Sequence, residues 1–175
     1  MQNKKVVIIS LLVLVVLFFG AGYAYKTNKS EQLASNVKAN YSALVREHSV
    51  VIGNKDAKVE LVEFFDPACE TCAQFYPLVN DLINKYPGKV KVEMRYTPFH
   101  KGADKVVAML EAAHLQGKFW PALELLFTNQ RGWTRHHVAQ PEQALQILSP
   151  LALNQQQLQT DMFSEQVSQV ITQDV

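Results

Sequence analysis

The chain has very few cysteines: Cys69 and Cys72 are the only two in 175 residues, and two positions separate them. This excludes a small exported scaffold held together by several disulfides. A structural zinc site usually has four protein ligands, and the sequence offers no second cysteine pair to complete one. His136 and His137 are adjacent and cannot share one helix face, so a metal site there is the weaker alternative.

The chain also lacks an excess of charge of either sign. It has 17 basic and 16 acidic residues and a formal net charge of +1. Nothing in this balance suggests nucleic acid or a strongly charged partner, and we predict no nucleic-acid partner. The sequence contains no internal repeat and no low-complexity tract, and its 48% hydrophobic residues are enough for a compact core.

One long hydrophobic run, residues 6–25, contains no charged side chain and follows Lys4 and Lys5. Its length is about that of a membrane-spanning helix, ~20 residues. The same layout fits a secretory signal, with Gly22-Tyr23-Ala24 as the cleavage site. The run is long for a cleaved signal, so we favour an anchor at residues 1–25 and keep cleavage as the alternative. In both cases the domain is exported, and we expect it in the periplasm or another space outside the inner membrane.

Residues 26–48 are predicted to form a short polar linker and then an amphipathic helix from Glu31 to His48, with Ser30 as its N-cap. Apolar residues recur on one side of this helix. The helix is expected to pack on its own domain or to serve as a spacer. The alternative is a homo-oligomer formed through the same helix, although the stripe is too short to predict a coiled coil.

The two cysteines lie between a strand-like run and a helix-like run. Residues 59–65 are β-branched and aromatic and predict a buried strand, and apolar residues from Ala73 to Ile83 follow a helical period. Cys69 is thus expected at the first turn of a helix, where unpaired N–H groups and the helix dipole favour the thiolate. Cys72 lies one turn further on, close enough for a disulfide with Cys69. We expect Cys69 to attack and Cys72 to resolve the mixed disulfide.

The segment Val62-Glu63-Phe64-Phe65-Asp66-Pro67-Ala68-Cys69-Glu70-Thr71-Cys72 resembles the active site of DsbA-like thiol–disulfide oxidoreductases, a branch of the thioredoxin superfamily. The resemblance extends from Val50 to Val175. It implies an α/β thioredoxin-like fold, with its core at residues 49–102 and a helical insertion at residues 103–175. It also implies disulfide exchange with exported proteins and a membrane or soluble redox partner. Neither an organic cofactor nor a metal is expected, because the electrons stay on sulfur.

The resemblance makes Glu63 the candidate for proton transfer, since thioredoxin-like proteins bury an acidic residue at this place behind the cysteines. Burial is expected to raise the pKa of Glu63 and make it a usable acid or base. The alternative is a strand glutamate that faces solvent. Glu70 and Thr71 lie between the cysteines and are expected to tune the reduction potential of the Cys69–Cys72 couple. The negative charge of Glu70 disfavours a thiolate at Cys69 and predicts a less oxidising protein than a relative with a basic residue there.

A second strand is predicted from Lys89 to Tyr96, with Pro98 as its terminator rather than as the cis-proline of the family. Trp120 and Trp133 are expected to pack in the core. The rest of the chain is predicted to be helical, with helices expected at residues 103–117, 119–128, 142–148 and 155–173.

The family pattern continues with a Gly-Thr-Pro-like segment, two strands and a last helix. The sequence ends before them, so the fold is expected to be incomplete at the C-terminus.

The sequence leaves open whether the protein acts as an oxidase, an isomerase or a reductase. A purely structural disulfide is disfavoured because its loop is very small. The rival function is a non-catalytic binding or chaperone-like module with an inert cysteine pair, which oligomerises through its N-terminal helix.

Overall fold

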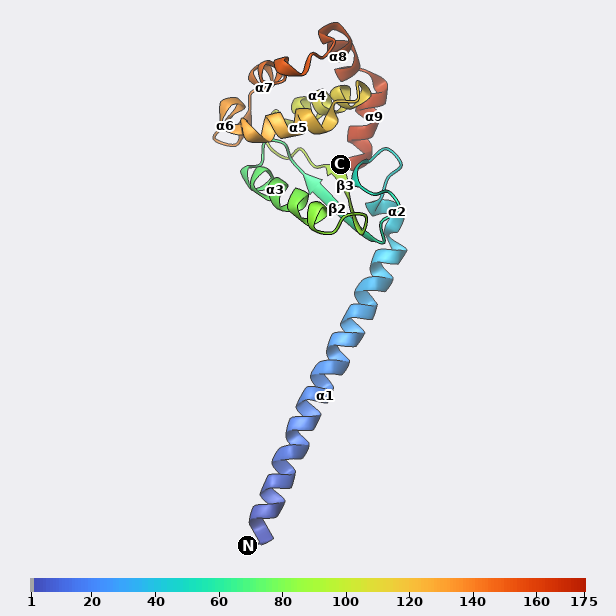
Figure 1. Ribbon diagram of the computed structural model, residues 1–175, viewed down its shortest axis with the longest axis vertical. Coiled ribbons are helices and arrows are strands. Elements are labelled where there is room, and N and C mark those ends of the chain that lie inside the picture. The colour runs from blue at the N-terminus through green and yellow to red at the C-terminus, as the bar shows by residue number, and fades with distance from the viewer. Residues whose placement is uncertain (1) are drawn as a thin grey trace. The chain divides into compact units, whose positions relative to one another are not determined.

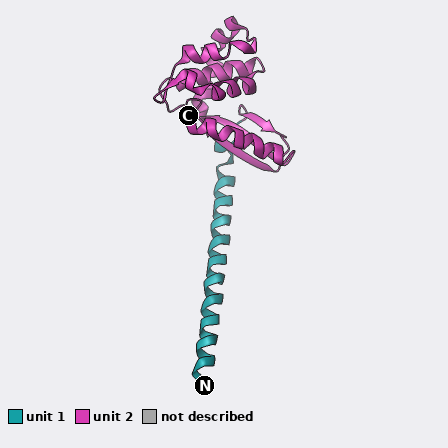
Figure 2. Cartoon of the chain, turned by 60° about the vertical axis from the view of Figure 1, so that its left-hand side comes forward, with its two compact units in different colours: residues 1–46 teal, residues 47–175 magenta. Residues whose placement is uncertain are grey.

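The computed structural model describes residues 2–175. Contacts divide the chain into two compact units, residues 1–46 and residues 47–175 (Figure 2). The first unit contains α1 (Gln2–Ala39) and the single-turn α2 (Tyr41–Leu44). By length and composition, α1 is long and apolar enough to cross a membrane, and its position near the N-terminus also fits a signal sequence.

The polar linker predicted after the hydrophobic run is wrong. α1 continues without a break through Lys26 and Ser30 as far as Ala39, so Ser30 is an internal helical residue and not an N-cap. The predicted helix from Glu31 to His48 is likewise divided between the end of α1 and α2. Residues 26–39 contain no proline or glycine and are rich in helix-forming residues, so nothing local stops the helix. Self-association through this region stays a prediction.

The second unit is built on a three-stranded sheet of β1 (Val50–Gly53), β2 (Val59–Phe65) and β3 (Val90–Tyr96), in the order β1-β3-β2. β1 pairs with β3 in antiparallel fashion, whereas β2 pairs with β3 in parallel. The strands predicted at residues 59–65 and 89–96 are confirmed, and Pro98 lies just beyond the end of β3. The expected burial of the first of them is wrong, since only Phe65 in β2 is buried and Val59, Leu61 and Phe64 are 50%, 38% and 46% exposed. In the described part of the chain, β2 is an edge strand.

α3 (Glu70–Lys85) connects the parallel strands β2 and β3, which a tight hairpin cannot join. One side of α3 packs on the core through half-buried residues: Cys72, Ala73, Tyr76, Val79 and Ile83. The apolar stripe that the sequence predicted is confirmed at Ala73, Tyr76, Val79 and Ile83, whereas Phe75 and Leu78, also expected on it, are 56% and 59% exposed. The chain leaves the helix through Gly88, whose φ of +73° favours glycine.

Helices α4 to α9 gather in one lobe, with α3 set along the sheet (Figure 1). α4 is central to this lobe: it packs against α5, α7, α8 and α9, and Val106, Val107 and Leu110 on it are fully buried. The elements of the lobe are α4 (Ala103–Leu115), α5 (Phe119–Thr128), α6 (Gln130–Trp133), β4 (Thr134–Arg135), β5 (Val138–Ala139), α7 (Pro141–Ile147), a 3₁₀ turn (Ser149–Leu151), α8 (Gln155–Met162) and α9 (Glu165–Asp174).

Two details of the lobe differ from the sequence-based expectation. The single helix expected at residues 155–173 is two helices, because the side chain of Ser164 accepts a hydrogen bond from the Val167 N–H and starts α9 afresh. Phe163 is 86% exposed at this break. The segment between the helices expected at residues 119–128 and 142–148, for which no element was predicted, contains α6 and a small hairpin. Trp133 is buried as expected, and its indole N–H donates to the Leu126 carbonyl.

A buried carboxylate joins α9 to the sheet. One oxygen of Asp174 accepts from Arg95 Nε of β3 and lies 2.9 Å from His48 Nε2, and the other accepts from the Tyr96 N–H at 2.8 Å. The last helix is therefore tied to β3 by a buried ion pair and a backbone hydrogen bond. No periodicity in the sequence pointed to this contact.

Candidate active site

The cysteine pair lies where β2 gives way to α3. Asp66, Pro67 and Ala68 form a buried turn, and the Cys69 N–H donates to the Asp66 carbonyl at 3.0 Å. Cys69 is the N-cap of α3, with an extended backbone, and its carbonyl accepts the first helical hydrogen bond from Ala73. The predicted position of Cys69 at the start of a helix is thus confirmed. Both cysteines are half-buried free thiols, so exposure alone does not distinguish the attacking sulfur from the resolving one.

Asp66 holds the turn from inside. Its side chain is fully buried, and one oxygen accepts from the Ala68 N–H at 2.7 Å. The other oxygen accepts from the N–H groups of Phe99 and His100 and contacts His100 Nδ1, each at 2.9 Å. The segment after β3 is thereby tied to the turn that presents Cys69.

Gln130 holds the same turn from the helical lobe. Its buried side-chain amide donates to the Pro67 carbonyl at 2.8 Å and to the Cys69 carbonyl at 3.0 Å. The cysteine turn is therefore fixed on two sides, by Asp66 within its own segment and by Gln130 from α6. Sequence analysis missed these roles of Asp66, His100 and Gln130. Only the Asp66-Pro67 pair, a common turn sequence, offered a local signal.

The environment of Cys72 favours its protonated form. Burial is the largest cause and raises the pKa of Cys72 to about 11, and the neighbouring Cys69 and the charge of Glu63 act in the same direction. A backbone hydrogen bond from Asp66 opposes the shift but does not cancel it. Cys72 therefore keeps its proton at neutral pH. A resolving thiol keeps its proton in the same way until a base removes it.

Glu63 lies beside Cys72 at the wall of a shared groove. Burial raises the pKa of its carboxyl, in the predicted direction. Its Oε2 is buried and has no hydrogen-bond partner within the described structure. A carboxyl that is partly withdrawn from water and next to a thiol can accept or return a proton near neutral pH.

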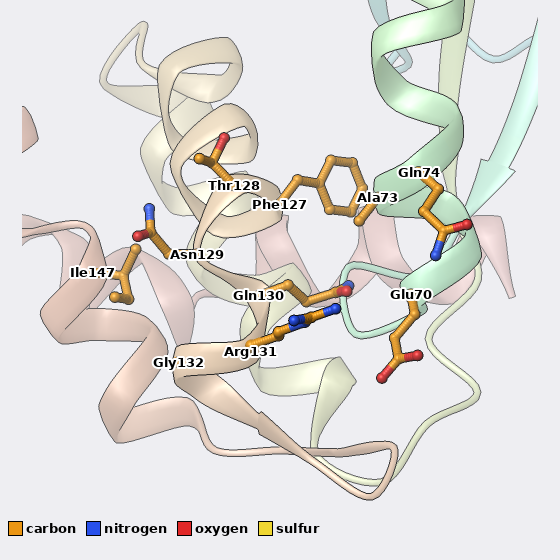
Figure 3. A pocket seen from close by; sticks show the side chains of 10 residues that line it. All are labelled: Glu70, Ala73, Gln74, Phe127, Thr128, Asn129, Gln130, Arg131, Gly132 and Ile147. Carbon is orange, nitrogen blue, oxygen red and sulfur yellow. The ribbon is translucent and has the colours of Figure 1, made fainter.

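Glu70 and Thr71 are exposed in the first turn of α3. Glu70 borders an open cleft of about 520 Å³ between α3 and the α5–α6 segment. In Figure 3, Gln130 and Arg131 extend from α6 toward the N-terminal part of α3, which carries Glu70 and Gln74. The carboxylate of Glu70 and the guanidinium of Arg131 thus line the same cleft.

His136 and His137 form the turn of the β4–β5 hairpin, with φ values of 50° and 62°. The ring of His137 stacks on His100, with 5.5 Å between ring centroids. Among residues 2–175, no cluster of three His, Cys, Asp or Glu side chains has the arrangement of a metal site.

Comparison with known proteins agrees with this geometry. The Thioredoxin family matches residues 45–175. A solved thioredoxin-like oxidoreductase from Silicibacter pomeroyi DSS-3 is 28% identical, with a TM-score of 0.64 over 74% of this chain and 71% of that one. The thiol-disulfide exchange protein alpha-DsbA2 from Wolbachia pipientis is 17% identical and shares the fold, with a TM-score of 0.69 over 84% of this chain and 77% of that one.

A curated relative of another kind matches part of the chain. The Na(+)/H(+) antiporter NhaA of Herminiimonas arsenicoxydans is 34% identical over 86 residues, which are 49% of this chain but only 14% of that protein. Because the match covers so little of the antiporter, it does not assign ion antiport to this chain. The family match covers most of the chain and includes the strand, the cysteine pair and the helix described above. The chain belongs to the thioredoxin family, with the α/β fold and helical insertion of its DsbA-like oxidoreductases.

Proposed function

We propose that this protein exchanges disulfides with exported proteins through Cys69 and Cys72. The observation that carries the proposal is the placement of Cys69 at the start of α3 with Cys72 held as a thiol one turn behind it. The N-terminal helix supports an exported site, because its length and apolarity fit a membrane anchor or a signal sequence. An oxidising compartment outside the cytoplasm is where such exchange is useful.

In the oxidising direction, a client thiolate attacks Cys69 Sγ of the Cys69–Cys72 disulfide. A sulfur–sulfur bond forms between client and Cys69, and Cys72 leaves as a thiolate that takes up a proton. The second client thiol gives up its proton and attacks the client sulfur of this mixed disulfide. Cys69 is then released, the client gains a disulfide, and the protein holds two thiols. The same steps in reverse reduce a disulfide of the client. One partial cycle in each direction isomerises the disulfides of a client.

Glu63 is the proposed proton carrier for Cys72. Its carboxyl lies in the groove that Cys72 also lines, and the charge of Glu63 disfavours the ionised form of Cys72. A proton taken up by the Cys72 thiolate is therefore most readily supplied through Glu63, directly or through water.

Equilibration of the full chain in detergent with reduced and oxidised glutathione tests the proposal. Acid quenching, alkylation and mass spectrometry measure the fraction of protein with two free thiols at each glutathione ratio. We expect this fraction to follow a single two-electron couple. A protein whose thiols stay alkylatable at every ratio would be the inert binding module instead.

Replacing Glu70 with histidine is expected to make the protein more oxidising. The change removes a negative charge beside Cys69 and stabilises the reduced state, since a thiolate there no longer faces a carboxylate. We expect a shift of about 30 mV, which is about tenfold in the equilibrium constant with glutathione. Glu70→Gln separates loss of charge from the effect of the imidazole. A potential that stays at the wild-type value in both variants would contradict the electrostatic role of Glu70.

Replacing Glu63 with glutamine is expected to flatten the pH dependence of stability. Because the pKa of Glu63 is raised, the stabilisation from its bound proton is complete below the ordinary value of 4.5 and is lost as the pH rises through the raised pKa. Glutamine cannot ionise, so the variant should be more stable at neutral pH. The gain should stay below about 1 kcal/mol, because the carboxyl is partly exposed and solvent screens it.

Urea unfolding at several pH values measures this difference. Glu124→Gln, at an exposed position of α5, is the control and should keep the wild-type pH profile. If Glu63→Gln keeps that profile as well, the carboxyl of Glu63 does not hold its proton more tightly in the folded protein.

A further inference from the structure

A polar cleft of about 520 Å³ adjoins the cysteine pair, between α3 and the α5–α6 segment. Glu70 lines this cleft and directly follows Cys69 in the chain. Gln130 also lines it, and the side-chain amide of Gln130 donates to the Cys69 carbonyl at 3.0 Å. Cys69 is next to the cleft but is not one of the residues that line it. A molecule in the cleft therefore has its reacting atom at the rim, next to Cys69, and the rest of its body inside.

The two walls of the cleft carry opposite charges. Glu70 on α3 and Arg131 on α6 are both exposed, and within residues 2–175 neither of them forms an ion pair. In Figure 3 the side chain of Arg131 extends toward the part of α3 that carries Glu70. Because the two charges do not pair with each other, the guanidinium is available to a carboxylate and the carboxylate of Glu70 to an ammonium group. A purely anionic occupant would be repelled by Glu70.

The size and walls of the cleft favour a small molecule over a polypeptide. Its volume falls within the roughly 300–1,000 Å³ that is usual for small-ligand sites. Phe127 and Ile147 offer apolar contacts for methylene groups, and Thr128 and Asn129 offer polar ones. The walls come from helices, whose backbone groups are hydrogen-bonded internally, so the cleft has no strand edge to which an extended peptide could add.

We propose that this cleft binds a small disulfide whose halves each carry an ammonium and a carboxylate group, and that this disulfide reoxidises the cysteine pair. The inference rests on the proposed disulfide exchange and names the chemical class of an oxidant for the same site. Arg131 binds the carboxylate of one half and Glu70 binds its ammonium group. The sulfur of that half lies at the rim of the cleft, within reach of Cys69.

The reaction balances with the disulfide as the oxidant. The Cys69 thiolate attacks the sulfur of the bound half and forms a mixed disulfide, and the other half leaves as a thiolate that takes up a proton. Cys72 then gives up its proton and attacks Cys69 Sγ, which releases the bound half as a second thiol. The protein loses two electrons and gains the Cys69–Cys72 disulfide, and the small disulfide becomes two thiols.

Four small disulfides of similar size test the charge requirement. Cystine carries both groups on each half, cystamine only ammonium groups, dithiodipropionate only carboxylates, and hydroxyethyl disulfide neither. The rate at which each oxidises the reduced full chain in detergent is measured by acid quenching, alkylation and mass spectrometry. Each rate is divided by the rate of the same disulfide with N-acetylcysteine at the same pH, which corrects for the intrinsic reactivity of the disulfide. We expect the corrected rate of cystine to exceed that of hydroxyethyl disulfide about tenfold, the effect of one or two hydrogen bonds to charged groups.

Removal of the cation separates binding in the cleft from long-range attraction. Arg131→Gln should lower the corrected rates of cystine and dithiodipropionate several-fold and leave that of hydroxyethyl disulfide unchanged. Cystine has no net charge at neutral pH, so the general field of the protein does not attract it, and a change in its rate reports direct contact. Arg135→Gln, at an exposed position that does not line the cleft, is the matched control and should leave all four rates unchanged.

A second pair of variants changes the space in the cleft and leaves the charges that line it intact. Thr128→Trp places an indole in the cleft and should bring the corrected rate of cystine down to that of hydroxyethyl disulfide. Glu124→Trp, at an exposed position of the same helix outside the cleft, should keep the advantage of cystine. Circular dichroism spectra equal to that of the wild type confirm that both variants fold.

The outcomes separate the two proposals. No reaction with any of the four disulfides would overturn the exchange function itself. Equal corrected rates for cystine and hydroxyethyl disulfide, unchanged by Arg131→Gln and Thr128→Trp, would overturn binding in the cleft alone. Opposite changes for dithiodipropionate and cystamine in Arg131→Gln, with cystine unaffected, would show long-range attraction only and would also overturn it. If Thr128→Trp slowed a disulfide-bonded peptide as much as cystine, the cleft would be a polypeptide site, and the small-disulfide proposal would be wrong.

Discussion

Replacing Cys69 with serine is expected to abolish disulfide exchange, whereas replacing Cys72 with serine is expected to trap the client. Cys69 is the N-cap of α3 and lies at the end of the buried turn, ahead of the helix that contains Cys72. Cys72 is held as a thiol by burial, with its pKa raised to about 11. Without Cys69 no mixed disulfide forms on the chain at this position. Without Cys72 the mixed disulfide forms but has no internal thiol to release it.

The measurement is non-reducing electrophoresis with mass spectrometry after incubation with a disulfide-bonded peptide. Cys72→Ser should accumulate a covalent adduct at Cys69, and Cys69→Ser should show only background labelling. Equal circular dichroism spectra for the two variants would exclude misfolding as the cause. Adducts of comparable yield on Cys72 in the Cys69→Ser protein would reverse the assigned roles.

Replacing Asp66 with alanine is expected to cause the largest loss of stability of any change at the site. The carboxylate is fully buried and receives hydrogen bonds from Ala68, Phe99 and His100. Alanine leaves several buried N–H groups without an acceptor, at roughly 1–3 kcal/mol for each group that water cannot reach. We expect a total loss of about 3–5 kcal/mol, a large fraction of the 5–15 kcal/mol typical of a folded domain.

Chemical denaturation of the reduced protein measures this loss. Asp66→Asn retains one acceptor oxygen and should fall between wild type and alanine. Asp81→Ala, at an exposed position of α3, is the control and should change stability by no more than about 0.5 kcal/mol. If Asp66→Ala unfolds at the same denaturant concentration as Asp81→Ala, the hydrogen bonds of Asp66 do not support the turn.

The elements around the cysteine pair follow local rules, and so they were predictable. β2 and β3 carry alternating or continuous β-branched and aromatic residues, and α3 carries a clear helical stripe. The errors occurred where local signals were weak or competed. The continuation of α1 through Lys26 and Ser30 depended on the absence of a stop signal, and the break at Phe163 depended on one serine.

The sequence by itself determined the strand, the helix and the cysteine pair between them, because each depends on residues no more than a few turns apart. Tertiary structure alone decided what surrounds the pair. Gln130 reaches the Cys69 carbonyl from 61 positions away, and His100 meets Asp66 across 34 positions. The proton held on Cys72 likewise depends on burial by packed neighbours. Hydrogen bonds and desolvation depend on which side chains are close in space. A local periodicity in the sequence does not predict which distant side chains the folded chain brings together.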